Sequence, residues 1–304
     1  MTRVVEDRAE MRRYIRMLRK NRISIGFVPT MGALHEGHRS LMRRSFRDND
    51  RTIVSIYVNP LQFGPSEDFE RYPRDLEKDL VSCRAEKADV VFAPTVAQMN
   101  PPGRTTTVHV AGVSEDYEGA VRPSHFDGVA TIVATLLNVV QADRAYFGQK
   151  DYQQTVVVRR LVQDLAIPTD IVVCPIVRDP DGLALSSRNV YLTAEDRKEA
   201  LRLPGALVKA EQAVLGGETS CDKLRKLMRT AMRSRREDVT VDYADVVHPE
   251  TMVPLGDLDG HGVLIAVLRV GRTRLLDNRV VAPPGTAAWE GCCRRPSASP
   301  AARS

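Results

Sequence analysis

Cysteine is scarce in this 304-residue sequence, and its few cysteines form no recognisable site. None belongs to a CxxC pair or a Cys/His cluster, which excludes the usual zinc motifs, and none has the surroundings of a catalytic nucleophile. A disulfide framework is also unsupported, so we expect reduced thiols. The five residues are Cys83, Cys174, Cys221, Cys292 and Cys293.

Long apolar runs are absent too. No uninterrupted hydrophobic stretch approaches the roughly 20 residues that a membrane-spanning helix needs. The N-terminal segment MTRVVEDRAEMRRYIRMLRK carries charges where a secretory signal would place its apolar region. We therefore expect a cytoplasmic protein without a membrane partner.

Aromatic residues make up only 5% of the chain, and a net charge of +5, equal to that of the whole chain, lies in the first 22 residues. Such a basic segment could bind nucleic acid. However, Met11, Tyr14, Ile15 and Leu18 recur at helical spacing, which predicts an amphipathic helix with its arginines on the solvent side. No RNA- or DNA-binding motif accompanies them, so we expect no nucleic-acid partner.

The first half of the chain alternates short β-branched segments with helical ones. This pattern predicts an α/β fold, in which a parallel sheet is covered by helices on both faces. The expected strands are 23–29, 52–58, 89–95, 143–148 and 169–177. The expected helices are 37–48, 76–88, 127–141 and 153–166.

The pattern changes near Val177. Beyond it, helical periodicity covers 194–216 and 221–235, and the segments 239–247 and 262–277 read as strands that can pair antiparallel. We therefore predict a first domain over 1–176 and a smaller α+β domain over 177–282. Residues 283–304 are rich in Pro, Ala and Ser and lack periodicity, so we expect a disordered tail.

Polar loops follow four of the expected parallel strands. Their sequences begin TMGALHEGH, NPLQFG, GQKDYQQ and RDPDGLALSSRN. The carboxyl ends of parallel strands meet at one edge of the sheet, where ligands bind in such folds. The four loops therefore predict one shared site.

The loop PTMGALHEGH combines a strand end, glycines and the start of a helix. Gly32 permits a close backbone approach, and the free N–H groups of a helix N-terminus favour an anion such as phosphate. His35 and His38 lie on one face of that turn and can stabilise phosphate charge. Zinc and a plain structural corner are the alternatives, but HxxH alone supplies only two ligands. A phosphate site is therefore favoured.

The other loops supply complementary groups. Lys150 and Arg188 can bind phosphate, with Ser186 and Ser187 as hydroxyl donors, and Asp151 can accept from a ribose hydroxyl. The amides of Asn59, Gln62 and Gln154 suit a substrate with both hydroxyl and carboxylate groups. Asp79 is compatible with magnesium or with a solvated acid. For each loop alone, an ordinary cap, turn or ion pair remains an alternative.

Six ordered motifs, PTMGALHEGH, VNPLQFG, YPR, GQKDYQQ, LSSRN and TRLLDN, resemble those of the pantoate–β-alanine ligase family over roughly Ile23 to Asn278. HEGH matches the HxGH signature of the nucleotidylyltransferase superfamily. The resemblance implies a Rossmann-like N-terminal domain, a smaller C-terminal lid domain and a homodimer. It also implies that ATP, with Mg²⁺, converts (R)-pantoate to pantoyl adenylate, from which β-alanine displaces AMP to give pantothenate.

The resemblance further implies roles for individual residues. His35, His38, Lys150 and Arg188 would be catalytic, with His38 either a proton donor or a stabiliser of charge. Asn59, Gln62, Tyr72 and Gln154 would bind pantoate, Gln62 would also face β-alanine, and Asp79 would lie beside magnesium. ATP would contact Met31, Gly32, Ala33, Leu34, His35, Glu36, Gly37, His38, Gly148, Gln149, Lys150, Asp151, Val177, Leu185, Ser186, Ser187 and Arg188.

Two positions depart from the family pattern, since Asp75 stands where Thr is expected and Leu185 where Met is common. Neither change removes a charged group. HxGH alone would also fit a different nucleotidylyltransferase or an enzyme that adenylates another acid, but Gln62 together with Gln154 favours pantoate. A non-catalytic nucleotide-binding regulator would lack the charge-stabilising residues, which are all present here.

Overall fold

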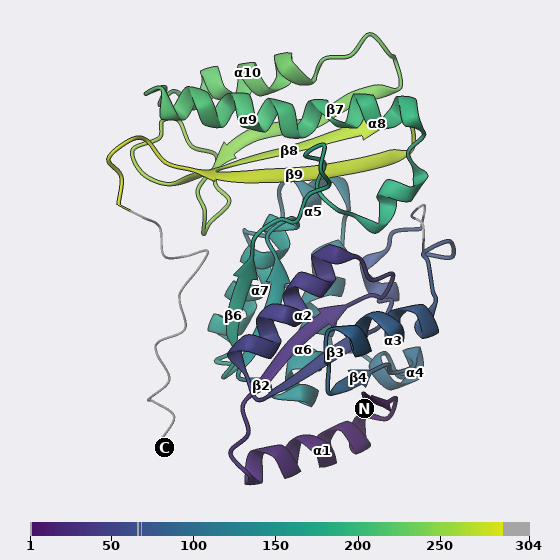
Figure 1. Ribbon diagram of the computed structural model, residues 1–304. Coiled ribbons are helices and arrows are strands. Elements are labelled where there is room, and N and C mark those ends of the chain that lie inside the picture. The colour runs from purple at the N-terminus through teal and green to yellow at the C-terminus, as the bar shows by residue number, and fades with distance from the viewer. Residues whose placement is uncertain (1, 66, 68, 288–304) are drawn as a thin grey trace.

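Two separate sheets organise the chain (Figure 1). The computed structural model describes residues 2–65, 67 and 69–287. The parallel sheet contains β1 (Arg3–Val5), β2 (Ile25–Thr30), β3 (Arg51–Ile56), β4 (Val90–Phe92), β5 (Arg144–Gly148) and β6 (Asp170–Cys174). The antiparallel sheet contains β7 (Val239–Val247), β8 (Gly262–Val270) and β9 (Thr273–Val281).

Helices and 3-10 turns connect these strands. Those before β6 are α1 (Arg8–Lys20), α2 (Glu36–Asp48), η1 (Pro60–Gln62), α3 (Leu76–Ala85), α4 (Val96–Met99), α5 (Glu118–Val121), α6 (His125–Val140) and α7 (Tyr152–Asp164). Those after β6 are η2 (Ser187–Tyr191), α8 (Ala194–Ala200), α9 (Arg202–Leu215) and α10 (Cys221–Met232).

The six-stranded sheet is parallel throughout, with the order β1-β4-β3-β2-β5-β6. The chain proceeds from β2 outward through β3 to β4, and then returns to add β5 on the other side of β2. The order therefore reverses between β2 and β5, and a ligand site is expected at the carboxyl ends of these two strands. The predicted α/β fold is confirmed.

Alternating strand side chains separate two hydrophobic cores. Phe27 and Ile53 face a core that contains residues of α1, α6 and α7. Their neighbours Val28 and Val54 face a second core with residues of α2 and α3. Because successive strand residues point to opposite faces, continuous apolar strands are needed when both faces are covered.

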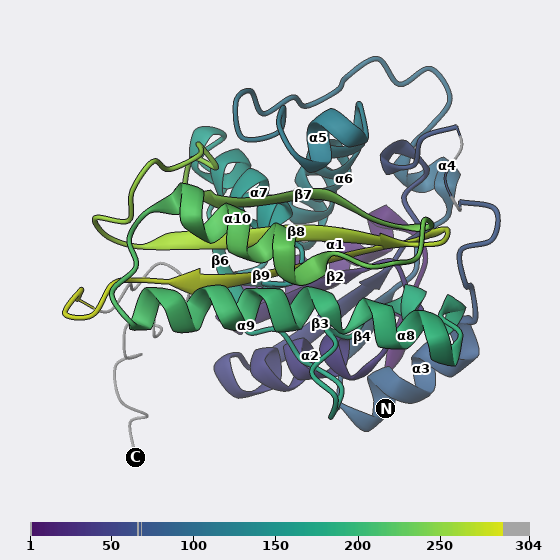
Figure 2. The same cartoon turned by 90° about the horizontal axis from the view of Figure 1, so that it is seen from above.

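The antiparallel sheet has its own core on the side of α9 and α10, which lie above it in Figure 1 and across it in Figure 2. The other face of this sheet contacts the part of the chain that contains the parallel sheet: Tyr152 and Val156 of α7 pack with Val247 and Val263. The lower face of the small sheet therefore closes over the carboxyl-end region of the parallel sheet. The division into domains 1–176 and 177–282 stays a prediction.

Several element boundaries differ from the expected ones. The expected helix 194–216 is two helices, α8 and α9, separated at Leu201. The expected segment 262–277 is a hairpin that turns at Gly271, where φ is +55°, and its second strand continues to Val281. Strand β1 was missed, because three residues carry too little periodicity to identify it. Most of the expected tail, residues 288–304, lies outside the described residues.

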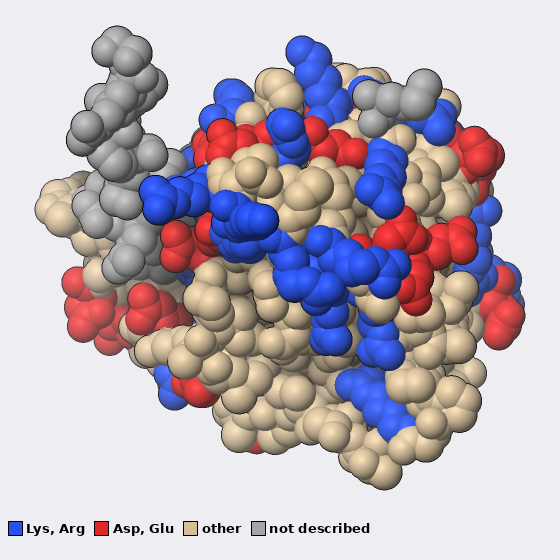
Figure 3. Space-filling model, turned by 90° about the horizontal axis from the view of Figure 1, so that it is seen from below, with Lys and Arg blue, Asp and Glu red and all other residues tan. Residues whose placement is uncertain are grey.

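Helix α1 confirms the predicted amphipathic pattern, since Met11, Ile15 and Leu18 are buried. Figure 3 shows the molecule from the α1 side, where Lys and Arg side chains gather in a band.

Asp75, one of the two departures from the family pattern, caps α3 by accepting from the N–H of Lys78 at 3.0 Å. Among the described residues, no helix has both the length and the apolar character needed to cross a membrane.

Gly128 is expected to be essential for the packing of α6 against η1. A Cβ at this position would overlap the carbonyl of Leu61 and lie 2.7 Å from the Gln62 nitrogen. Gly128→Ala should lower the free energy of unfolding by about 1–3 kcal/mol, as in other overpacked sites. Gly205 of α9 is the matched control, because a Cβ there meets nothing within 4 Å. Gly205→Ala should be neutral or stabilise by up to ~1 kcal/mol in urea unfolding. Equal stability of the two variants would contradict the prediction.

Candidate active site

Residues Met31 to His38 form the loop after the carboxyl end of β2 and the first turn of α2. Gly32 has φ of +82°, and a Cβ there would lie 2.8 Å from Oδ2 of Asp79. The Asp79 carboxylate accepts from the backbone N–H groups of Ala33 at 3.0 Å and Leu34 at 2.8 Å. Asp79 of α3 therefore holds the loop in the conformation that faces the site.

This arrangement bears on the expected magnesium role of Asp79. Asp79 is only 3% exposed, and each of its carboxylate oxygens already accepts a loop N–H. Burial raises its pKa despite these hydrogen bonds. Among the described residues, no group of three or more His, Cys, Asp or Glu is placed to hold a metal ion. Both oxygens of Asp79 are thus engaged with the loop, and this geometry favours a structural role for the residue.

The two histidines are held in defined tautomers. Nδ1 of His35 accepts from the N–H of Gly37 at 3.1 Å, and Nδ1 of His38 accepts from the N–H of His35 at 3.3 Å. Their ring centroids lie 4.1 Å apart. In a neutral imidazole whose Nδ1 accepts, Nε2 carries the proton. Both rings therefore offer an Nε2–H donor, beside the N-terminus of α2.

Both imidazoles are neutral in the free protein at pH 7. Burial, and then the charge of Lys150, lower the pKa of His35 to about 4. Burial, His35 and Lys150 lower the pKa of His38 to about 3. Lys150 follows β5, the neighbour of β2 in the sheet, and its charge contributes to the lowered pKa of both rings. Two neutral N–H donors and one cation suit a phosphate group.

Lys150 lies on the loop between β5 and α7, and the small sheet fixes that loop. The Asn278 amide of β9 donates to the carbonyls of Gln149 and Lys150, both at 2.9 Å, and accepts from Nε2 of Gln149 at 3.1 Å. Asn278 is only 2% exposed. We did not single it out from the sequence, where its only signal was its place at the end of the TRLLDN motif.

Asn59 and Gln62 lie together at the turn after β3. The Asn59 amide donates to Oε1 of Gln62 and to the Gly128 carbonyl, both at 3.0 Å, and accepts from the N–H of Leu61 at 3.1 Å. Asn59 is 2% exposed, so its side chain is fully engaged within the protein. The position of Asn59 therefore favours a role in orienting Gln62 over direct contact with a substrate. Since Oε1 of Gln62 accepts from Asn59, its NH₂ group remains as the donor for a substrate.

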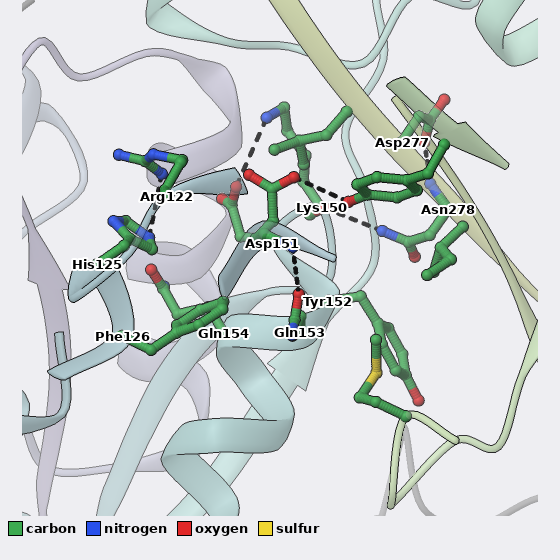
Figure 4. A pocket seen from close by; sticks show the side chains of 15 residues that line it. Arg122, His125, Phe126, Lys150, Asp151, Tyr152, Gln153, Gln154, Asp277 and Asn278 are labelled. Carbon is green, nitrogen blue, oxygen red and sulfur yellow. Dashed lines mark hydrogen bonds and ion pairs between the residues drawn. The ribbon is translucent and has the colours of Figure 1, made fainter. Parts of the chain in front are cut away.

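Gln154 of α7 lines the pocket between the two sheets, together with Lys150 and His125 (Figure 4). Nδ1 of His125 donates to the Gln62 carbonyl at 2.8 Å, so its Nε2 can accept from Arg122 at 3.1 Å. Burial, and then Arg122, lower the pKa of His125 to about 4. Arg122 and His125 were missed in the sequence, although RPSHF precedes a helix as other site motifs do.

Tyr72, Val177 and Ser186 lie in three different places. Tyr72 is buried and packs edge-to-face on Phe63, 5.9 Å between ring centroids, rather than lining this pocket. The carbonyl of Val177 accepts from the N–H of Leu185 at 3.0 Å, so it closes the connecting loop. Ser186 shares a smaller cavity with Lys150, which confirms that these two loops converge.

Arg188 lines a wide groove next to this pocket, and the two share Glu118, Arg122 and Leu276 as wall residues. The structure therefore brings together the β2, β3 and β5 loops, while the LSSRN segment reaches the site through Ser186.

The tautomers give a prediction for histidine NMR spectra. His35 and His38 should remain neutral, with the proton on Nε2, down to about pH 5, because their pKa values lie far below 6.5. The unfolded chain binds these protons at higher pH than the folded protein. The free energy of unfolding should therefore fall as pH drops from about 6.5 to about 4. His109 is the internal control, because its hydrogen bond to Asp127 raises its pKa. Titration of His38 near pH 6.5 would disprove the assignment.

Asn278 gives a second prediction. Asn278→Asp keeps the side-chain size but replaces its NH₂ donor with an oxygen that faces the Gln149 and Lys150 carbonyls. The loop should shift and Lys150 with it. In the reaction that the family resemblance leads us to expect, kcat/KM for ATP should fall by about 10–100-fold, the cost of misplaced catalytic groups. The corresponding value for pantoate, measured at saturating ATP, should change less. Parent-like ATP kinetics in a folded variant would show that Asn278 does not position Lys150.

Comparison with known proteins shows the family of this chain. The family model for pantoate–β-alanine ligase matches residues 3–280. The pantothenate synthetase of Acetivibrio thermocellus is 47% identical over 279 residues, which are 92% of this chain and 99% of the relative. The enzyme of the same name from Thermotoga neapolitana has the same identity and coverage.

Solved structures give the same result. A crystal structure of the Thermus thermophilus pantothenate synthetase superposes with a TM-score of 0.88 at 46% identity, covering 93% of this chain and 100% of that one. The Francisella tularensis pantoate–β-alanine ligase, complexed with β,γ-ATP and β-alanine, has a TM-score of 0.76 at 31% identity, covering 92% and 98%. From its sequence, fold and site, the chain belongs to the pantoate–β-alanine ligase family.

Proposed function

We propose that the site between the two sheets makes pantothenate from (R)-pantoate, β-alanine and ATP in two steps. A pantoate carboxylate oxygen attacks the α-phosphorus of ATP, and the bond to pyrophosphate breaks. The β-alanine amine then attacks the acyl carbon of pantoyl adenylate, AMP leaves, and the amine loses a proton. Family membership and the β,γ-ATP and β-alanine complex of the Francisella relative support this proposal.

One observation carries the proposal: the loops with the candidate phosphate-binding and carboxylate-binding groups follow β2, β3 and β5, which are neighbours in the parallel sheet. His35 and His38 follow β2 and each keeps an Nε2–H donor, and Lys150 follows β5. The amides of Gln62 and Gln154 come from the neighbouring η1 and α7. A carboxylate and the α-phosphate can thus be held side by side, which is the main requirement of this reaction.

ATP is assigned to the β2–α2 loop, the β5–α7 loop and the LSSRN segment. Residues from Met31 to His38 would lie along the nucleotide phosphates, and Gly148 to Asp151 would approach from the other side of the sheet's switch point. Ser186, Ser187 and Arg188 would complete the phosphate contacts as the small sheet closes over the site. Val177 and Leu185 would border the adenine.

Pantoate is assigned to Gln62 and Gln154, with β-alanine also near Gln62. The fixed donor of Gln62 suits a carboxylate or hydroxyl oxygen of the substrate. Asn59 orients Gln62 through the hydrogen bond to its Oε1. Tyr72 packs on Phe63, which follows Gln62 in the same turn.

His38 acts best as a neutral hydrogen-bond donor. With its pKa lowered to about 3, the free protein has no proton on Nδ1 to transfer at neutral pH. The chemistry does not require one, because the carboxylate is already a nucleophile and pyrophosphate is a good leaving group. Its Nε2–H would instead stabilise charge that develops on the α-phosphate oxygens.

Magnesium would enter with ATP, held mainly by the phosphates, since the ion usually retains water and takes few protein ligands. We assign no step to Asp79. A homodimer and a cytoplasmic location are also part of the proposal, and neither a nucleic acid nor a membrane is needed for the reaction.

ATP–pyrophosphate exchange tests the function. Exchange should require pantoate and no β-alanine, and AMP should form once the amine is added. Exchange without pantoate, or with a different acid in its place, would favour another adenylating enzyme of the superfamily.

His38→Ala tests the mechanism. Loss of the Nε2–H donor should slow adenylation by about 10²–10⁴-fold, the usual effect of removing one such group. His109→Ala is the matched control, because His109 is an exposed histidine paired with Asp127, outside the site. Its exchange rate should equal that of the parent. Near-normal exchange in His38→Ala would mean that His38 is structural.

A further inference from the structure

A wide groove lies beside the pocket that holds Lys150 and Gln154. Its walls come from the segment around Glu67 and Arg71, from α5, from η2 and α8, and from the β8–β9 turn. Figures 1 and 2 show that turn and α8 at the same end of the molecule. Seven arginines but only four carboxylates line the groove, so it has a surplus of positive charge.

Each of the four carboxylates is paired with an arginine of the groove. Glu67 pairs with Arg122 at 2.6 Å, and Glu118 pairs with Arg274 at 2.6 Å. The other two carboxylates share one arginine: Arg236 lies 2.8 Å from Asp196 and 2.7 Å from Asp238. A negatively charged ligand would therefore meet little repulsion.

Two of the other arginines, which come from different parts of the chain, are exposed. Arg71 precedes α3, and Arg272 lies at the β8–β9 turn. Within the described part of the chain, neither has an ion-pair or hydrogen-bond partner. Arg188, assigned above to ATP phosphates, lines the same groove. The groove thus extends the phosphate site outward along guanidinium groups.

We propose that this groove binds inorganic pyrophosphate as it leaves the site after adenylation. The proposal rests on the proposed function, which supplies this product. Pyrophosphate carries several negative charges on oxygens that match the planar donor geometry of guanidinium groups. The groove spans about 2210 Å³ of empty space including open solvent, so it forms an exit path rather than a closed pocket. Arg71 and Arg272 are the residues that draw pyrophosphate outward.

The test is the double variant Arg71→Glu/Arg272→Glu, studied by pantoate-dependent ATP–pyrophosphate exchange. The pyrophosphate concentration that gives half-maximal exchange should rise about 10-fold or more, because two cations become anions beside a polyanion. Raising the ionic strength should reduce the difference from the parent. The matched control is Arg229→Glu on α10, an exposed arginine outside the groove. Its half-saturating concentration should stay within about twofold of the parent, since a distant surface charge is largely screened.

An unchanged pyrophosphate constant in the double variant would overturn the proposal. An equal rise in the constant for ATP would also overturn it, because the groove would then belong to ATP binding. Titration calorimetry of pyrophosphate alone gives a second measure, and Arg272→Gln removes one charge with less risk to folding. Failure of the parent to exchange without β-alanine would sink the proposed function instead, which separates the two results.

Discussion

Two neighbouring residues of β9, Asp277 and Asn278, hold the site together. The Asp277 carboxylate accepts from both terminal nitrogens of Arg178, at 2.6 and 2.8 Å, on the loop that connects the two units. Asn278 engages the backbone of Gln149 and Lys150. Asp277 is almost fully buried, and a buried charge is tolerated only when it is paired and hydrogen-bonded. The small sheet is therefore fixed to the parallel sheet beside Lys150.

Other buried polar side chains of the site also have hydrogen-bond partners within the protein. Asp79 orders the loop before His35, Asn59 orients Gln62, and each imidazole accepts a backbone N–H. Every buried polar side chain in this set has its partners, so the donors that remain have fixed directions. Donors that are already oriented need not reorganise when charge develops on a phosphate. An arriving phosphate would raise the histidine pKa values and strengthen the same contacts.

The sequence was sufficient for the fold class because hydrophobic pattern and loop chemistry agreed. Apolar strands such as β2 and β3 could belong only to a sheet covered on both faces, and their polar loops indicated which edge carries the site. The roles of Asp79 and Asn59 were less accessible. Each was recognised as a polar residue at this edge of the sheet, but only the structure shows the hydrogen bonds that its side chain makes within the protein.

Long-range partners explain the other omissions. Asn278 lies 129 positions from Gln149 in the chain, and no local pattern identifies such a contact. Arg122 and His125 are ordered by the Gln62 carbonyl, which lies 60 and 63 positions away in the sequence. The local geometry of His35 and His38 at the start of α2 was therefore predictable. Tertiary contacts such as those of Asn278 were not.

Strand β9 also determines how the cavities can change together. Leu276 lines the Lys150–Gln154 pocket, the smaller cavity with Ser186, and the arginine groove. Any movement of the small sheet that keeps the Asp277 and Asn278 contacts must pivot near these residues. Lys150 would then stay in place, while the distant β8–β9 turn with Arg272 would move most. Such a pivot would alter the outer groove while Lys150 and the two histidines keep their positions. Closure of the small sheet over the proposed adenylate would then be independent of the groups proposed to help form it.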